Sequence, residues 1–124
     1  MINGAHVVLY TADPEADRAF FRDILNFSCV DAGHGWLIFA LPAAEAAFHD
    51  LDKEVVDQND ARQTARHELF LMCGDIATTL RELKAKQVPV SAVSEQRWGK
   101  LATLTLPGGS TLGIYEPKHP RPQQ

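Results

Sequence analysis

Hydrophobic positions along the chain follow two periods, of about two and about 3.6 residues, which are typical of strands and helices respectively. Segment 6–11 is rich in β-branched and aromatic residues and predicts a first strand. A helix is predicted over 14–26, because Asp13 can cap it, Pro14 suits its first turn, and apolar residues recur at three- and four-residue steps. Further strands are predicted at 28–32, 36–41 and 45–50. The first part of the chain therefore has the order βαβββ.

The second part of the chain repeats this order after a polar connector at 51–65. Asp75 can cap a second helix, in which Ile76, Leu80 and Leu83 form an apolar stripe. The predicted strands are 67–73, 88–93, 101–106 and 111–116, with turns at 98–99 and 107–109. The order is again βαβββ.

Repeated landmarks support a duplicated unit. His6 and His67 are 61 positions apart, Asp13 and Asp75 are 62 apart, and the Leu-Pro pairs at 41–42 and 106–107 are 65 apart. Each unit alone is too short to bury both a sheet and a helix well. We predict one α+β domain made of two tandem βαβββ modules, at about 5–50 and 66–117, whose sheets curl around a central cavity, followed by a flexible tail at 118–124.

Composition narrows the class of protein. The 124 residues are 45% hydrophobic, which suits a globular domain, and the net charge of -4 argues against nucleic-acid and anionic-membrane partners. Residues 1–6 lack the basic stretch and apolar run of a secretory signal, and no apolar segment is long enough to span a membrane. We therefore expect a cytoplasmic protein, in which Cys29 and Cys73 are free thiols.

Three of the five histidines occupy related positions. His6 and His67 open the first strand of each module, and His49 lies near the end of the last strand of the first module. Each could make only a local hydrogen bond, or the three could converge on one metal ion, since imidazole suits zinc, iron, nickel, manganese and copper. His34 in its Gly-His-Gly turn and His119 in the tail are not expected to take part.

Strand alternation predicts where these side chains point. It places His67 on the face of Leu69 and Leu71, and it leaves Phe70 and Met72 to pack beneath the helices. The same argument applied to the other two strands directs all three histidines into the space that the sheets enclose.

Several motifs together resemble the vicinal oxygen chelate superfamily, which comprises glyoxalase I, bleomycin-resistance proteins and extradiol dioxygenases. They are the tandem βαβββ units, the His-Val-Val-Leu-Tyr-Thr-Ala-Asp-Pro passage from His6, the Phe20-Phe21 pair, and Leu-Pro-Gly-Gly-Ser-Thr-Leu-Gly-Ile-Tyr ending at Tyr115. The resemblance covers about 6–117.

The resemblance implies a divalent metal ion, Fe, Zn, Ni or Mn, held by His6, His49 and His67. The family's glutamate commonly lies six residues after the turn proline, where this chain has Gly113, so standard glyoxalase I activity is not expected. Glu116 lies on the opposite strand face, whereas Tyr115 shares the face of Gly113 and is a candidate proton donor. Three histidines alone, a ligand from solvent or substrate, or one of the glutamates at 45 and 68 could complete the site.

Two functions are favoured, and a third, a structural or interaction protein with a vestigial site, would leave the three histidines unexplained. The first is a metal-dependent lyase-like or dioxygenase-like enzyme acting on a small organic substrate through neighbouring oxygens. The second is a small-molecule binding protein of the bleomycin-resistance type, with Tyr10, Trp36, Phe39 and Trp98 as walls of the binding site. For either function the resemblance implies a homodimer, in which one site draws residues from both chains.

Overall fold

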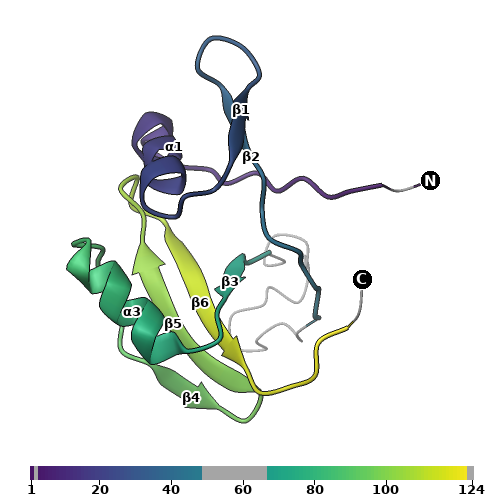
Figure 1. Cartoon of the computed structure of the whole chain (residues 1–124), viewed down its shortest axis with the longest axis vertical. Helices are drawn as coiled ribbons and strands as arrows, with labels where there is room; N and C mark the ends of the chain where they lie inside the picture. Colours follow the sequence, from purple (N-terminus) through teal and green to yellow (C-terminus); the bar gives the residue numbers. More distant parts are fainter. Residues whose placement is uncertain (2, 49–66, 123–124) are drawn as a thin grey trace, which may run out of the picture.

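The computed structural model describes residues 1, 3–48 and 67–122, and it confirms the α+β class (Figure 1). The elements, in chain order, are α1 (Pro14–Asp23), β1 (Cys29–Asp31), β2 (Leu37–Phe39), β3 (Phe70–Met72), α3 (Ile76–Ala85), β4 (Ser94–Gln96), β5 (Gly99–Thr105) and β6 (Thr111–Pro117).

The second half of the chain contains the complete βαβββ unit. Its four strands form one sheet in the order β3-β6-β5-β4, in which β3 runs parallel to β6 and the other pairs are antiparallel. In the first half, β1 and β2 form an antiparallel hairpin. Its predicted turn is confirmed: Gly33, His34 and Gly35 all have positive φ, and Asp31 accepts the N–H of Gly33 at 2.7 Å.

Three strand predictions differ from the structure. Segment 6–11 belongs to no strand, because its backbone has no ladder partner among the described residues, and its apolar side chains are exposed. Of segment 45–50, residues 45–48 form no strand and the rest lies outside the described residues. The strand predicted at 88–93 reduces to one bridge between Val90 and Leu104, next to Pro89, which has no N–H to donate.

The two helices begin and end in the same way. Asp13 accepts the N–H of Ala16 at the start of α1, and Asp75 accepts the N–H groups of Ala77 and Thr78 at the start of α3. Each helix is followed by a residue in the left-handed region, at positions 26 and 87, with φ of 59° and 64°. This conformation ends α1 before the predicted residue 26. The repeated caps support the duplication inferred from the sequence.

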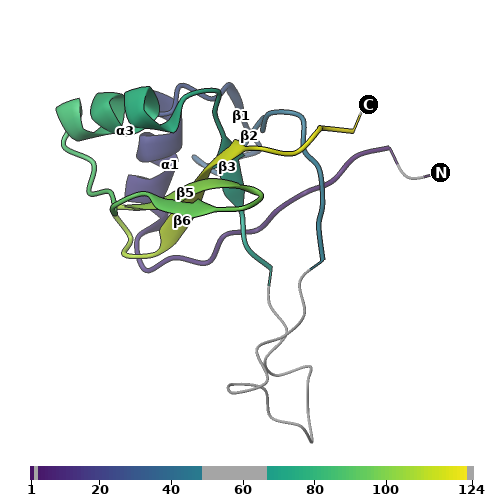
Figure 2. The ribbon, with the colours of Figure 1, turned by 90° about the horizontal axis from the view of Figure 1, so that it is seen from below.

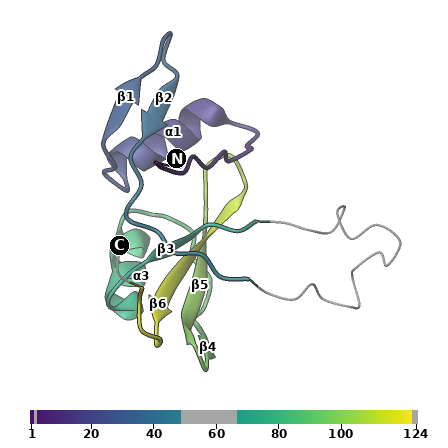
Figure 3. The same cartoon turned by 90° about the vertical axis from the view of Figure 1, so that its right-hand side faces the viewer.

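α3 covers one face of the four-stranded sheet, and α1 lies on the same side at the end of the sheet, where Asp17 accepts the N–H of Gly108 in the β5–β6 turn (Figure 2). Phe20 and Phe21 of α1 and the predicted stripe of α3 meet Leu104, Leu112 and Ile114 of the sheet in one hydrophobic core. Figure 3 shows α1 and the β1–β2 hairpin at one end of the molecule and the four-stranded sheet at the other. The face of the sheet away from the helices is called the open face below.

Two smaller expectations concern the cysteines and membranes. Cys29 and Cys73 are free thiols, as predicted. No helix in the described part of the chain is long and apolar enough to cross a membrane.

Candidate functional site

A groove of about 370 Å³ lies between the N-terminal segment and the strands of the second half. Its walls are Val8, Leu9 and Tyr10 on one side, and His67, Glu68, Leu69, Phe70, Thr103, Ser110, Thr111, Leu112 and Gly113 on the other. This lining combines aromatic rings, hydroxyl groups, an imidazole and a carboxylate. We refer to it as the groove.

The two faces of β3 are the reverse of the sequence prediction. Leu69 and Leu71 pack against the hydrophobic core under the helices. Phe70 pairs with Gly113 in the parallel ladder, and side chains of paired residues share a face, so Phe70 lies on the open face. The prediction failed because all the residues of 69–73 are apolar, and alternation in such a run does not show which face is buried.

The ring of Phe70 occupies the space beside Gly113 where a side chain would project. A Cβ built on Gly113 would overlap Cδ1 of this ring and would lie 2.8 Å from Cγ. Phe70 also makes an edge contact with Tyr115, with ring centroids 6.2 Å apart. The position at which the resemblance expects a glutamate therefore has neither a carboxylate nor room for one while Phe70 keeps this position.

Tyr115 is buried on the open face, and its hydroxyl donates to the carbonyl oxygen of Trp98 at 2.9 Å. Burial raises the pKa of this phenol, and the negative charge of Glu45 raises it further. The rings of Trp98 and His119 flank it, at centroid distances of 5.5 Å and 5.7 Å. Tyr115 is thus the centre of an aromatic cluster, and its proton is engaged in a structural hydrogen bond.

Two of the three predicted metal ligands, His6 and His67, are among the described residues. His67 lines the groove and His6 does not, and both are exposed. His49 lies outside the described residues. Within 1, 3–48 and 67–122, no three His, Cys, Asp or Glu side chains come together in a metal-binding arrangement. The Phe70 ring also fills the space at Gly113, where the resemblance expects a carboxylate ligand. The described residues therefore do not form a metal site without a further ligand.

The repeated helix caps give a second way to align the two halves of the chain. Counting seven residues back from Asp13 reaches His6, and counting seven back from Asp75 reaches Glu68. By the offset of the caps, Glu68 corresponds to His6, whereas matching the two histidines pairs His6 with His67.

Of the four aromatic residues predicted as walls, only Tyr10 lines the groove. Phe39 packs edge-on against Phe21 beside the core, with centroids 5.5 Å apart. Trp36 lies under the guanidinium of Arg18, 4.7 Å from its ring centre. Trp98 contacts Tyr115 away from the groove.

The hydroxyl residues of the groove were missed by the sequence reasoning. Thr111 shares the strand face of Gly113, and Thr103 pairs with Gly113 from the neighbouring strand. Alternate residues of a strand share a face, so Tyr115, Gly113 and Thr111 point to the same side, and this alternation is the signal in the sequence that points to Thr111.

The other two glutamates considered for the site, Glu45 and Glu116, face elsewhere. Glu116 accepts the N–H of Ile76 at 2.8 Å, on the helix side of the sheet, as its strand position predicts. Glu45 binds Arg121 at 3.1 Å and lies 3.5 Å from His119, so it anchors the C-terminal segment. Neither glutamate lines the groove.

Comparisons with known proteins agree with this architecture. Residues 4–119 match the model of the Glyoxalase/Bleomycin resistance protein/Dioxygenase superfamily. No curated protein matches the chain.

Solved structures with the same fold include TnmS3, an antibiotic binding protein from Streptomyces sp. CB03234, with 21% identity, a TM-score of 0.61, and coverage of 95% of this chain and 100% of that one. They also include a lactoylglutathione lyase from Agrobacterium tumefaciens, with 19% identity, a TM-score of 0.61 and 92% coverage of both chains. These likenesses show the fold. With the family model matching nearly the whole chain, this protein belongs to the Glyoxalase/Bleomycin resistance protein/Dioxygenase superfamily.

Proposed function

We propose that this protein binds a small organic molecule in the groove and does so without metal chemistry. The observation that carries the proposal is the Phe70 ring over Gly113, because it puts an aromatic surface where the resemblance expects a metal-binding carboxylate. An aromatic floor of this kind stabilises a bound ring by stacking and by excluding water.

The lining of the groove indicates the chemistry of its ligand. A volume of about 370 Å³ falls in the range of small-molecule pockets. Tyr10 and Phe70 offer ring faces, whereas Thr103, Ser110 and Thr111 offer hydroxyl groups that both donate and accept hydrogen bonds. A planar, largely apolar ligand that carries a hydroxyl or carbonyl group meets both requirements. The antibiotic binding protein among the structural neighbours is consistent with such a role.

The proposal is tested with 2-naphthol, which combines a planar ring system with one hydroxyl group. The protein is first treated with a chelator, and binding is followed by amide chemical shifts in NMR. We expect a dissociation constant of about 0.1–1 mM, as befits so small a probe, with the largest shifts at Phe70, Thr111 and Gly113. Phe70→Ala should weaken binding, and Trp36→Ala, which removes an exposed aromatic residue outside the groove, should not. Equal affinity in both variants would contradict the proposal.

A metal-dependent enzyme is the second candidate, favoured by the presence of His67 and Glu68 in the same groove. It requires a further donor such as His6 or His49. Elemental analysis of protein purified without a chelator tests it. A stoichiometric divalent metal that is lost in His67→Ala would support this candidate, and a metal-free parent would reject it.

We also infer that the functional unit is a homodimer. The N-terminal segment exposes a run of apolar side chains, with Val8 60% and Tyr10 88% accessible, although its sequence is typical of a buried strand. Pairing with a strand of a second chain would bury this run and complete the wall of the groove. Sedimentation at working concentration should give a dimer, and a monomer would contradict the inference.

A further inference from the structure

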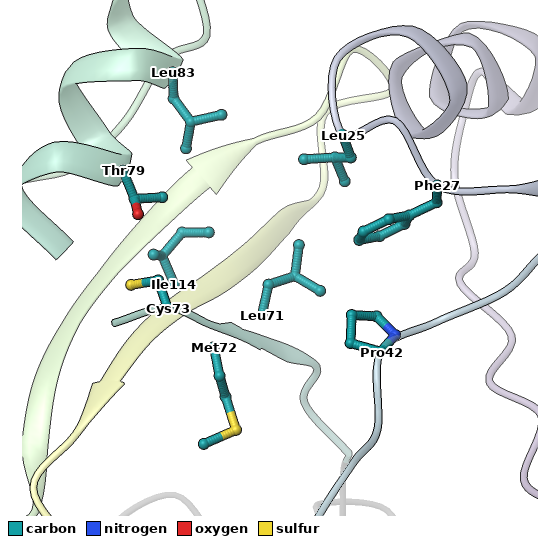
Figure 4. Close-up of a pocket in the computed structure, with 9 residues that line it drawn as sticks. All are labelled: Leu25, Phe27, Pro42, Leu71, Met72, Cys73, Thr79, Leu83 and Ile114. Carbon is teal, nitrogen blue, oxygen red and sulfur yellow. The ribbon is translucent and has the colours of Figure 1, made fainter. Parts of the chain in front are cut away.

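A second cavity, of about 190 Å³, lies on the helix side of the sheet (Figure 4). Its walls come from both halves of the chain: Leu25 and Phe27 from the segment after α1, and Thr79 and Leu83 from α3. Ile114 of β6 lies behind them. We call it the helix-side pocket.

The helix-side pocket is separate from the groove. None of the described residues lines both cavities. On β3, Leu71 points into the helix-side pocket and its neighbour Phe70 faces Gly113 across the sheet. Adjacent residues of one strand thus belong to different sites, which makes them a matched pair for mutation.

The lining of the helix-side pocket is apolar and uncharged. Among the described residues that line it, the only polar side chains are the hydroxyl of Thr79 and the thiol of Cys73. The Thr79 hydroxyl donates to the carbonyl oxygen of Asp75 at 3.1 Å, so its proton is engaged. Burial raises the pKa of the Cys73 thiol, which therefore stays neutral at physiological pH. A charged ligand would lose its hydration here with no opposite charge in exchange.

The volume of the helix-side pocket sets the size of its occupant. Apolar protein cavities of about 150 Å³ remain dry and bind benzene. At about 190 Å³ this pocket has room for a somewhat larger ring system. Met72 and Cys73 are both among the lining residues, and sulfur packs favourably against ring edges.

We propose that the helix-side pocket is a second binding site, which takes an uncharged aromatic molecule between benzene and indole in size. The site is independent of the groove and of its ligand. Because the pocket joins the two halves of the chain, an occupant contacts both halves at once.

The test uses indole as the probe and Cys73 as the reporter, in the Cys29→Ser variant of the full chain, where Cys73 is the only thiol. Alkylation of Cys73 by iodoacetamide should slow about tenfold when indole is present at ten times its dissociation constant, because only the unoccupied pocket reacts. Indole-3-carboxylate, which has the same rings and a negative charge, should give no protection at that concentration. In Cys73→Ser, alkylation of Cys29 should not change with indole.

Two variants of β3, made in the Cys29→Ser background, decide which cavity indole occupies. Leu71→Phe fills the helix-side pocket and should abolish the protection, whereas Phe70→Ala alters only the groove and should preserve it. Where Leu71→Phe does not fold, Thr79→Leu fills the same pocket from α3. An unchanged alkylation rate with indole, equal protection by indole-3-carboxylate, or protection lost in Phe70→Ala but kept in Leu71→Phe would each overturn the proposal.

Discussion

Replacing Gly113 by alanine tests the arrangement on the open face of the sheet. The added methyl group would overlap the Phe70 ring, with Cγ at 2.8 Å from the new Cβ. Because Phe70 is 38% exposed, its ring can move toward solvent, but it then loses its contacts with Gly113 and Tyr115. Overpacking of this kind costs about 1–3 kcal/mol, and loss of an edge contact between rings costs about 0.5–1.5 kcal/mol. We therefore expect Gly113→Ala to lower the free energy of unfolding by about 1–3 kcal/mol.

The measurement is urea unfolding followed by tryptophan fluorescence, with the same variant made in a Phe70→Ala background. Without the ring there is no overlap, so the alanine should cost almost nothing, and the coupling between the two positions should account for most of the effect. Gly74→Ala is the matched control, because a Cβ there meets nothing within 4 Å and it should be neutral or slightly stabilising. An equal cost of Gly113→Ala with and without Phe70 would refute the reasoning.

Three further predictions concern the helices and the half-buried thiol of Cys73. Asp17→Ala removes a buried carboxylate that accepts the N–H of Gly108, in the other half of the chain, at 2.8 Å. Urea unfolding should show a free energy of unfolding lower by about 1–3 kcal/mol, and an unchanged value would contradict this role. The Thr78 hydroxyl and N–H donate to Asp75 and lower its pKa in the folded protein. The cap therefore contributes its full stabilisation above the ordinary carboxyl pKa and loses it as pH falls through the lowered pKa of the folded state. The stability difference between the parent and Asp75→Ala should therefore shrink below about pH 4, and a constant difference would argue against it. Burial raises the pKa of Cys73, so the free energy of unfolding should decline as pH rises above the ordinary thiol pKa. In the Cys29→Ser variant, alkylation of Cys73 should therefore require a higher pH in the folded protein than in urea. Identical pH profiles of alkylation with and without urea would contradict this.

Local signals in the sequence predicted those elements whose causes are local. Asp13 and Asp75 cap the helices as expected, and the turn at 33–35 forms because glycine tolerates positive φ. The strands β5 and β6 lie close to the predicted ranges, on either side of the predicted turn at 107–109. These features depend on neighbouring residues, and a sequence shows its neighbours directly.

Features that depend on distant partners were less accessible. Segment 6–11 has the composition of a strand, but a strand also needs a partner, which composition does not specify. The faces of β3 were reversed because only the ladder with β6 shows that Phe70 lies beside Gly113. The same long-range contact covers the expected glutamate position, so the character of the groove emerged only from the structure.

The central question about this protein is whether the groove binds an aromatic ligand without a metal ion. The direct measurement is an NMR titration of the chelator-treated protein with 2-naphthol, repeated after addition of zinc. We predict saturable shifts at Phe70, Thr111 and Gly113 with the same dissociation constant in both titrations. Binding that appears only with zinc, or shifts that are absent from these three residues, would contradict the account.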